Sequence, residues 1–150
     1  MNFIDLQSVV RDLIAAHATF SADAASTVFA DVGNVKPLVE EALQVKGYAV
    51  TVWPPIRGNV TQDDGPAGIV PIESIIVVRL EVLPQKLAGQ DDPSAYLNGL
   101  VRDIIGAVLS APEEIGGVRF GVPPDAFDLM NFDEGLIAYH LRFKRLAVFG

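Results

Sequence analysis

Pairs of acidic residues are the first feature of the sequence that could do chemistry, because two neighbouring carboxylates can divide general acid and base work. Asp63-Asp64, Asp91-Asp92 and Glu113-Glu114 are doublets of this kind. Each stands at a predicted turn or helix start, where acidic side chains hydrogen-bond the local backbone. The doublets therefore indicate turns and caps, and they do not predict an active site.

Other catalytic patterns in the sequence are incomplete. The glycines of segment 116–121 are not clearly preceded by a strand and lack the lysine and hydroxyl residue of a phosphate-binding P-loop. His140, Asp133 and Ser74 are the residue types of a catalytic triad, but no G-x-S-x-G motif accompanies them and His140 is predicted on the polar face of a strand. The sequence therefore predicts a protein that is not an enzyme.

No metal or cofactor is predicted either. Cysteine is absent, which excludes thiolate ligands and disulfides, and His17 has no partner at metal-ligand spacing. Trp53 precedes two prolines. It is either a platform for stacking a ligand or a residue that closes one end of the core.

Length and charge narrow the class of protein further. The 150 residues fit one domain, 1–150, without a signal peptide or membrane span at the start. A formal net charge of −8 argues against tight binding of nucleic acid, because such binding depends on lysine and arginine. The absence of cysteine fits a reducing cytoplasm.

The charge is unevenly distributed along the chain. All nineteen acidic residues lie at or before Glu134, whereas the last predicted strand carries Arg142, Lys144 and Arg145. These cations are either paired by neighbouring carboxylates of the same chain or face acidic residues of another subunit. We treat them as candidate interface residues.

Apolar periodicity predicts an α/β (α+β) fold in which a mixed or antiparallel sheet is covered by two to three helices. The buried strand SIIVVRLEVL, 74–83, is expected at the centre and to end before Pro84, with further strands at 48–53 and 135–149 and short ones at 27–32, 118–122 and 127–132. Helices are predicted at 2–17, from an Asn34 cap to Gly47, and from an Asp92 cap to Ser110.

Alternation along the strands also predicts the core. Its expected strand residues are Val50, Val52, Ile76, Val78, Leu80, Ile137, Tyr139, Leu141 and Phe143. The second helix is expected to bury Leu38, Val39, Ala42 and Leu43. A change in the apolar phase after Lys144 predicts a β-bulge there.

Segment 54–71, PPIRGNVTQDDGPAGIVP, is predicted to be a long loop, because its prolines and glycines disfavour a regular ladder. We expect it to be mobile in the isolated subunit and ordered on assembly. Arg57, Asp63 and Asp64 are its candidate interface residues.

The order of these parts resembles the tail terminator or tail-completion (neck) proteins of long-tailed bacteriophages. The segments that carry the resemblance are LVEEALQVKGYAVTVWPPI, the strand IIVVRLEVLP, the helix DDPSAYLNGLVRDIIGAVL and the closing strand LIAYHLRFKRLAVFG. Segment 116–132 does not map onto that pattern. No functional residue is carried over, because the family has no catalytic signature to match.

The resemblance implies a virion protein, assembled in the host cytoplasm, that forms a ring, usually a hexamer, on the head-proximal end of the tail tube. Its expected partners are copies of itself, the tail tube protein and the head-tail connector or neck proteins. DNA would pass through the lumen without sequence-specific binding, which suits an acidic protein.

Two alternatives remain open. The chain could have another neck role, as a stopper or adaptor, which its position in a particle would reveal. It could also be a non-catalytic ligand-binding or regulatory domain, which predicts a monomer with a concave apolar pocket.

Overall fold

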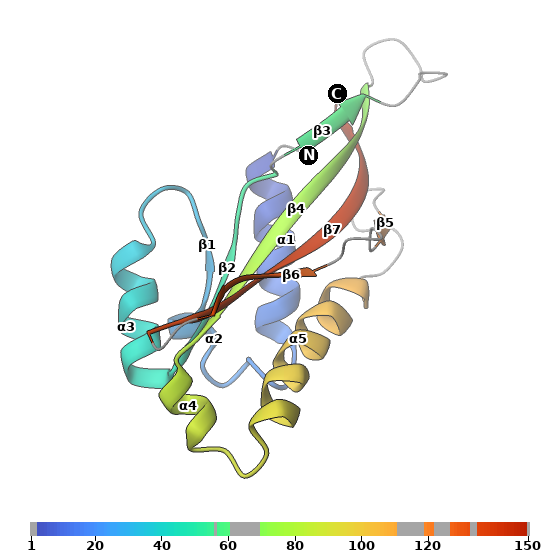
Figure 1. The fold of residues 1–150 in the computed structure, drawn as a ribbon. Coiled ribbons are helices and arrows are strands. Elements are labelled where there is room, and N and C mark those ends of the chain that lie inside the picture. Colours follow the sequence, from blue (N-terminus) through green and yellow to red (C-terminus); the bar gives the residue numbers. More distant parts are fainter. Residues whose placement is uncertain are drawn as a thin grey trace.

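Two long strands, β4 (Val70–Val82) and β7 (Ile137–Phe149), form the centre of the computed structural model (Figure 1). The structure describes residues 3–55, 57–60, 70–110, 119–121, 127–132 and 135–149. β4 and β7 pair antiparallel over thirteen residues, from Val70 opposite Phe149 to Val82 opposite Ile137. The predicted central strand is confirmed, and it begins earlier than the sequence pattern indicated.

Shorter strands extend the sheet on both sides of this pair. β2 (Tyr48–Val52) and β3 (Arg57–Val60) pair with β4, while β5 (Arg119–Gly121) and β6 (Phe127–Phe132) pair with β7. β1 (Val28–Ala30) lies parallel to β2, and all other pairs are antiparallel. The result is one α+β domain with a mixed seven-stranded sheet, which confirms the predicted fold class.

The prediction that 54–71 is one long loop is wrong. Arg57–Val60 forms β3, which pairs with Ile72–Ile75, and β4 already begins at Val70. The tetrapeptide of β3 contains no proline, so every backbone N–H is available to the ladder. Pro71 fits in β4 because it lies beyond the last β3 pair, where β7 is the only described strand that adjoins it. Segment 61–69 lies outside the described residues.

The predicted bulge after Lys144 is also wrong. β7 keeps one register with β4 from Ile137 to Phe149 and with β5 from Lys144 to Leu146. The change in apolar phase therefore does not mark an inserted residue. The irregularity lies in β6, where Met130 separates Leu129, opposite Tyr139, from Asn131, opposite Ala138.

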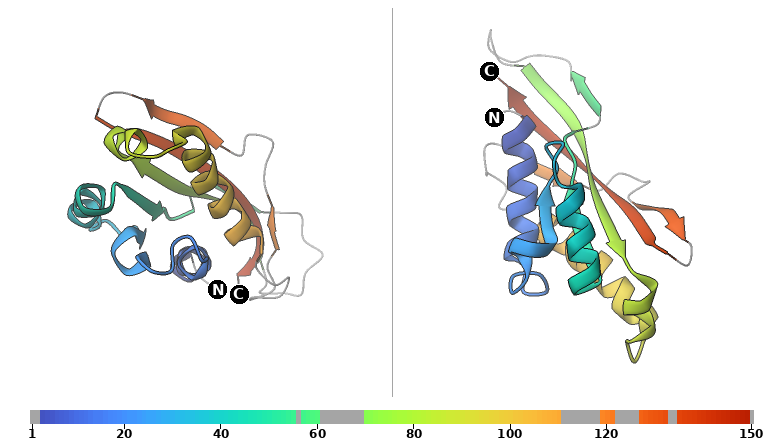
Figure 2. Two further views of the ribbon diagram at one scale, coloured as in Figure 1. Left: turned by 90° about the horizontal axis from the view of Figure 1, so that it is seen from below. Right: turned by 90° about the vertical axis from the view of Figure 1, so that its left-hand side faces the viewer.

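Helices cover both faces of the sheet (Figure 2). Their bounds are Phe3–Ala16 (α1), Ala24–Thr27 (α2), Lys36–Lys46 (α3), Pro84–Ala88 (α4) and Pro93–Leu109 (α5). The three longer helices match the predicted ones, whereas the short α2 and α4 were not predicted. A turn or so of helix carries too little periodicity to be detected in the sequence.

Two of the described helix ends follow the expected chemistry, and a third does not. Asp92 caps α5 by accepting a hydrogen bond from the Ala95 N–H at 3.0 Å, and Gly47 ends α3 in the left-handed region with φ of 82°. The predicted Asn34 cap is wrong. Val35 occupies the cap position of α3, without a side-chain hydrogen bond.

The larger core lies between one face of the sheet and the helices α1 and α5. It contains the predicted strand residues except Tyr139, which packs against it partly buried, and Ile137, which is buried outside this cluster. The two helices contribute residues such as Leu6, Val10, Leu100 and Ile104. A smaller cluster on the opposite face joins Val39 and Ala42 of α3 to Phe29 and Ala49. α3 thus covers the β1–β2 end of that face.

A buried glutamine connects α1 to the strand ends. Gln7 is 1% exposed, and its Nε2 donates hydrogen bonds to the carbonyl oxygens of Asp31 at 2.6 Å and Val52 at 2.7 Å. The Asp31 N–H also donates to the Val52 carbonyl at 2.9 Å. Gln7 therefore fixes the position of α1 against the ends of β1 and β2.

Candidate assembly surfaces and a polar pocket

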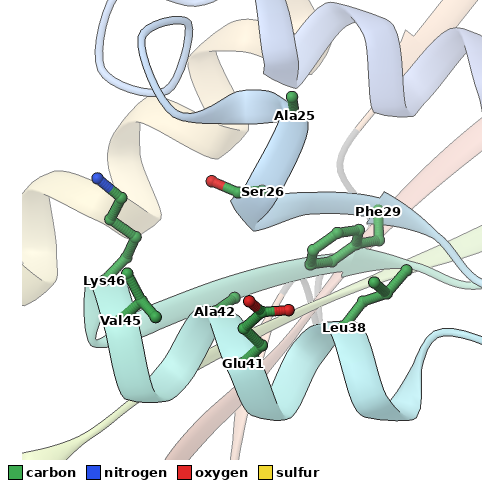
Figure 3. A pocket seen from close by; sticks show the side chains of 8 residues that line it. All are labelled: Ala25, Ser26, Phe29, Leu38, Glu41, Ala42, Val45 and Lys46. Atoms are coloured by element: carbon green, nitrogen blue, oxygen red, sulfur yellow. The ribbon is translucent and has the colours of Figure 1, made fainter.

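The first candidate surface is a groove between α2–β1 and α3, which we call the α2–α3 groove (Figure 3). It encloses about 300 Å³ and is lined by Ala25, Ser26, Phe29, Leu38, Glu41, Ala42, Val45 and Lys46. Leu38 is 47% exposed and Val45 69% exposed, so both apolar side chains face solvent. The prediction that Leu38 is buried is wrong, because α3 is apolar on two sides and only the Val39 side meets the sheet.

Two charged side chains line this groove, and one of them forms an ion pair with a described residue. Lys46 forms an ion pair with Asp23 at 3.1 Å. Glu41 is exposed and forms no ion pair with any described residue. The groove is therefore an apolar surface with an uncompensated carboxylate beside it.

The second candidate surface lies where α5 meets β6 and β7. A groove of about 330 Å³, the α5–β6 groove, is lined by Leu97, Asn98, Val101, Arg102, Ile105, Phe127 and Tyr139. Next to it Phe127, Leu129 and Met130 are 55%, 49% and 48% exposed, and we call these three residues the β6 ridge. Three large apolar side chains so close together on one short strand are typical of an interaction site.

A cation accompanies this second surface. The Arg102 side chain is 79% exposed, and its Nε lies 3.1 Å from Oδ1 of Asp103. Asp103 also accepts a hydrogen bond from the Thr19 hydroxyl at 2.7 Å. The rest of the Arg102 guanidinium is accessible to solvent, since the side chain is so widely exposed.

The two surfaces lie at opposite ends of one row of paired strands. Pairing runs from Val28 of β1 through Val50, Leu80 and Tyr139 to Leu129 of β6. Four steps between neighbouring strands separate β1 from β6, or roughly 19 Å at the usual strand spacing. The chain therefore presents two unlike apolar surfaces at opposite edges of its sheet.

A third site is a polar pocket between the first half of α3 and the sheet, which we call the α3–sheet pocket. It encloses about 270 Å³ and is lined by Asp31, Val35, Lys36, Val39, Glu40, Leu43, Thr51, Trp53, Arg79 and Glu81. Thr51 is 3% exposed, and its Oγ1 has no hydrogen-bond partner among the described residues. A buried hydroxyl without a partner is costly, and a water or a bound ligand can supply the missing hydrogen bond. Ser74 Oγ of β4 likewise has no partner among the described residues.

Paired side chains form the sheet side of this pocket. Arg79 forms an ion pair with Glu81 at 3.1 Å, and its Nη1 lies 3.0 Å from Nε2 of His140. The indole of Trp53 contacts the His140 ring edge-on at 4.7 Å between centroids. Burial, with the nearby cations Arg79 and Arg142, lowers the pKa of His140, although Asp128 opposes the shift. Neutral His140 therefore accepts a hydrogen bond from Arg79.

Three of the predicted interface residues have neighbouring backbone positions in the sheet, because Arg57 and Lys144 both lie opposite Ile75 of β4 and Arg145 follows Lys144. Arg142 forms an ion pair with Asp128 of its own chain at 2.7 Å, and Lys144 lies half-buried opposite Ile75. The backbones of Arg57 and Arg145 lie opposite Ile75 and Ser74 of β4. Asp63 and Asp64 lie outside the described residues. A role of these residues in a subunit contact stays a prediction.

The sequence did not predict either apolar surface, and it placed Leu38, Ala42 and Tyr139 of these grooves in the core. A signal was present for the first surface, because Leu38, Ala42 and Val45 follow helical spacing on the side of α3 next to Val39. The β6 ridge gave a weaker signal, because the extra residue Met130 interrupts the alternation of Phe127 and Leu129.

Among the described residues no group of three histidine, cysteine, aspartate or glutamate side chains could hold a metal ion. The described helices are also too short or too polar to cross a membrane. No protein-family model matches the chain, and no curated protein matches it either.

Proposed function

We propose that this chain is a structural subunit of a ring that sits on the head-proximal end of a bacteriophage tail tube. The ring ends polymerisation of the tube and provides the surface to which the head attaches. The observation that carries the proposal is the pair of unlike apolar surfaces at opposite edges of the sheet. Contacts between two different surfaces of identical subunits are heterologous, and they close into a ring when the rotation between subunits allows it.

The place of the ring in a virion rests on the resemblance of the element order to tail terminator proteins. The resemblance gives the expected hexamer, the tail tube below it and the neck proteins above it. The net charge of −8 supports a lumen through which DNA slides, because an acidic wall repels phosphate groups. The protein would then be found in the virion after assembly in the host cytoplasm.

Electron microscopy of particles made without this protein tests the proposal. Abnormally long tails are the expected result, because nothing then ends growth of the tube. Tails of normal length without heads would assign the chain to another neck role, as a stopper or adaptor. Particles that are normal in every respect would contradict a role in the tail.

A second candidate function is favoured by the α3–sheet pocket, where the buried Thr51 hydroxyl lacks a partner beside Trp53. In this alternative the chain is a monomeric ligand-binding or regulatory domain. Trp53 is the only tryptophan of the chain, so its fluorescence reports on this pocket directly. A monomer whose Trp53 emission saturates with a small polar ligand would favour the alternative.

A further inference from the structure

We propose that the β6 ridge of one copy sits in the α2–α3 groove of the next copy, with Arg102 of the first copy against Glu41 of the second. This inference rests on the proposed ring, and it names the two surfaces that form each subunit contact. The occupant of the groove is therefore a second copy of this chain.

Both sides of this contact expose large apolar side chains. The groove has Phe29 and Ala42 among its lining residues, with Leu38 and Val45 exposed beside them. The ridge offers three large apolar side chains on a strand that pairs with β7 on one side and with no described strand on the other. Bringing the two together removes exposed apolar surface from both, which is the main favourable term in association.

The charges beside the two surfaces are opposite in sign. Glu41 lines the groove without an ion pair among the described residues, and Arg102 lies next to Phe127 in the α5–β6 groove with its side chain widely exposed. Opposite charges at the rim of a contact fix its register and reject wrong pairings. Lys46 also lines the α2–α3 groove, but it is already paired with Asp23. Glu41 and Arg102 are therefore the opposite charges that a head-to-tail contact would pair.

A two-fold contact of either surface with itself would lose this match. Two α2–α3 grooves face to face would bring together two copies of Glu41, while the nearby Lys46 is already engaged by Asp23. Two β6 ridges would likewise bring together two copies of Arg102. Like charges placed together oppose association. The unlike surfaces therefore favour the heterologous arrangement over an isologous dimer.

Engineered disulfides test the contact, because the natural chain holds no cysteine. Two single variants, Val45→Cys and Leu129→Cys, replace exposed residues of the groove and the ridge. Oxidation of their mixture should give a disulfide-linked heterodimer as the main product, while each variant alone should remain largely uncross-linked. Ser8→Cys, at an exposed position of α1, replaces either variant as the control.

Two outcomes would overturn the inference. One is cross-linking of either variant with itself, which indicates a two-fold contact. The other is equal cross-linking in the mixtures that contain Ser8→Cys, which indicates random collision. If the unmodified chain forms rings but the Val45–Leu129 pair does not cross-link, the inference fails and the proposed ring survives; if neither rings nor cross-links form, both fail.

Charge reversal gives an independent test at positions where the fold is not at risk. Glu41→Arg and Arg102→Glu should each weaken assembly, and the double variant should restore it. Circular dichroism checks that all three variants remain folded. Equal loss of assembly in the single and double variants would show that the two residues do not meet.

Discussion

Replacing Gln7 by methionine should destabilise the domain, although glutamine is a residue type that usually lies exposed on the surface. The side chain is buried and its amide donates two hydrogen bonds, to the carbonyl oxygens of Asp31 and Val52. Methionine has nearly the same length but no donor, so both hydrogen bonds disappear while the packing volume is kept. The loss should separate α1 from the ends of β1 and β2.

The size of the loss in unfolding free energy depends on which backbone carbonyls still accept a hydrogen bond after the substitution. The Val52 carbonyl still accepts from the Asp31 N–H at 2.9 Å, whereas the Asp31 carbonyl has no other partner among the described residues. Two hydrogen bonds of about 1 kcal/mol each, with one stranded acceptor that is only partly buried, give a loss of roughly 2–3 kcal/mol in the free energy of unfolding. For a domain of this size that corresponds to about 4–12 °C in Tm.

Thermal and urea unfolding followed by circular dichroism would measure this loss. Gln44→Met is the matched control, because Gln44 is exposed on α3 and the same substitution there should change the free energy of unfolding by less than about 0.5 kcal/mol. A Gln7→Met variant as stable as this control would refute the role assigned to the buried amide.

Three further predictions concern the core, a turn and pH. Leu141→Ala should cost roughly 2–5 kcal/mol in denaturant unfolding, because Leu141 is fully buried in the larger core; a loss below about 1 kcal/mol would contradict the packing. Gly47→Ala should lower Tm, because φ is 82° and the added Cβ would lie 2.8 Å from a lysine side chain of α4, whereas Gly106→Ala, with open space around it in α5, should raise Tm slightly. His140 has a folded pKa below its ordinary 6.5, so the unfolded chain binds its proton first and stability should fall as the pH drops below about 6.5. His140→Gln should remove that part of the slope of unfolding free energy against pH, and an identical slope in both proteins would contradict the assignment.

Elements with a regular period or a distinctive end could be predicted from the sequence. The run of β-branched residues around Ile76 specified the central strand, and Asp92 and Gly47 specified helix ends through their backbone chemistry. β3 was not predicted because its four residues form a strand through pairing with β4. A local sequence pattern gives no information about such pairing.

The candidate surfaces were harder to predict for a similar reason. Leu38 looks like a core residue in the sequence, and only the position of α3 over the β1–β2 end of the sheet leaves it exposed. The role of Gln7 likewise depends on where two strands end. Exposure and hydrogen-bond partners that arise from distant segments are properties of the tertiary structure.

The most direct test of the central claim, a head-to-tail ring, is native mass spectrometry of the oxidised double variant that carries Val45→Cys and Leu129→Cys in one chain. Val45 lies on α3, which covers the β1–β2 end of the sheet, and Leu129 lies in β6 at the opposite edge, so their thiols should not meet within one subunit. The account predicts a closed ring in which every subunit contributes two cysteines to disulfides and no free thiol remains. Oxidised protein that stays monomeric with both thiols free would contradict it.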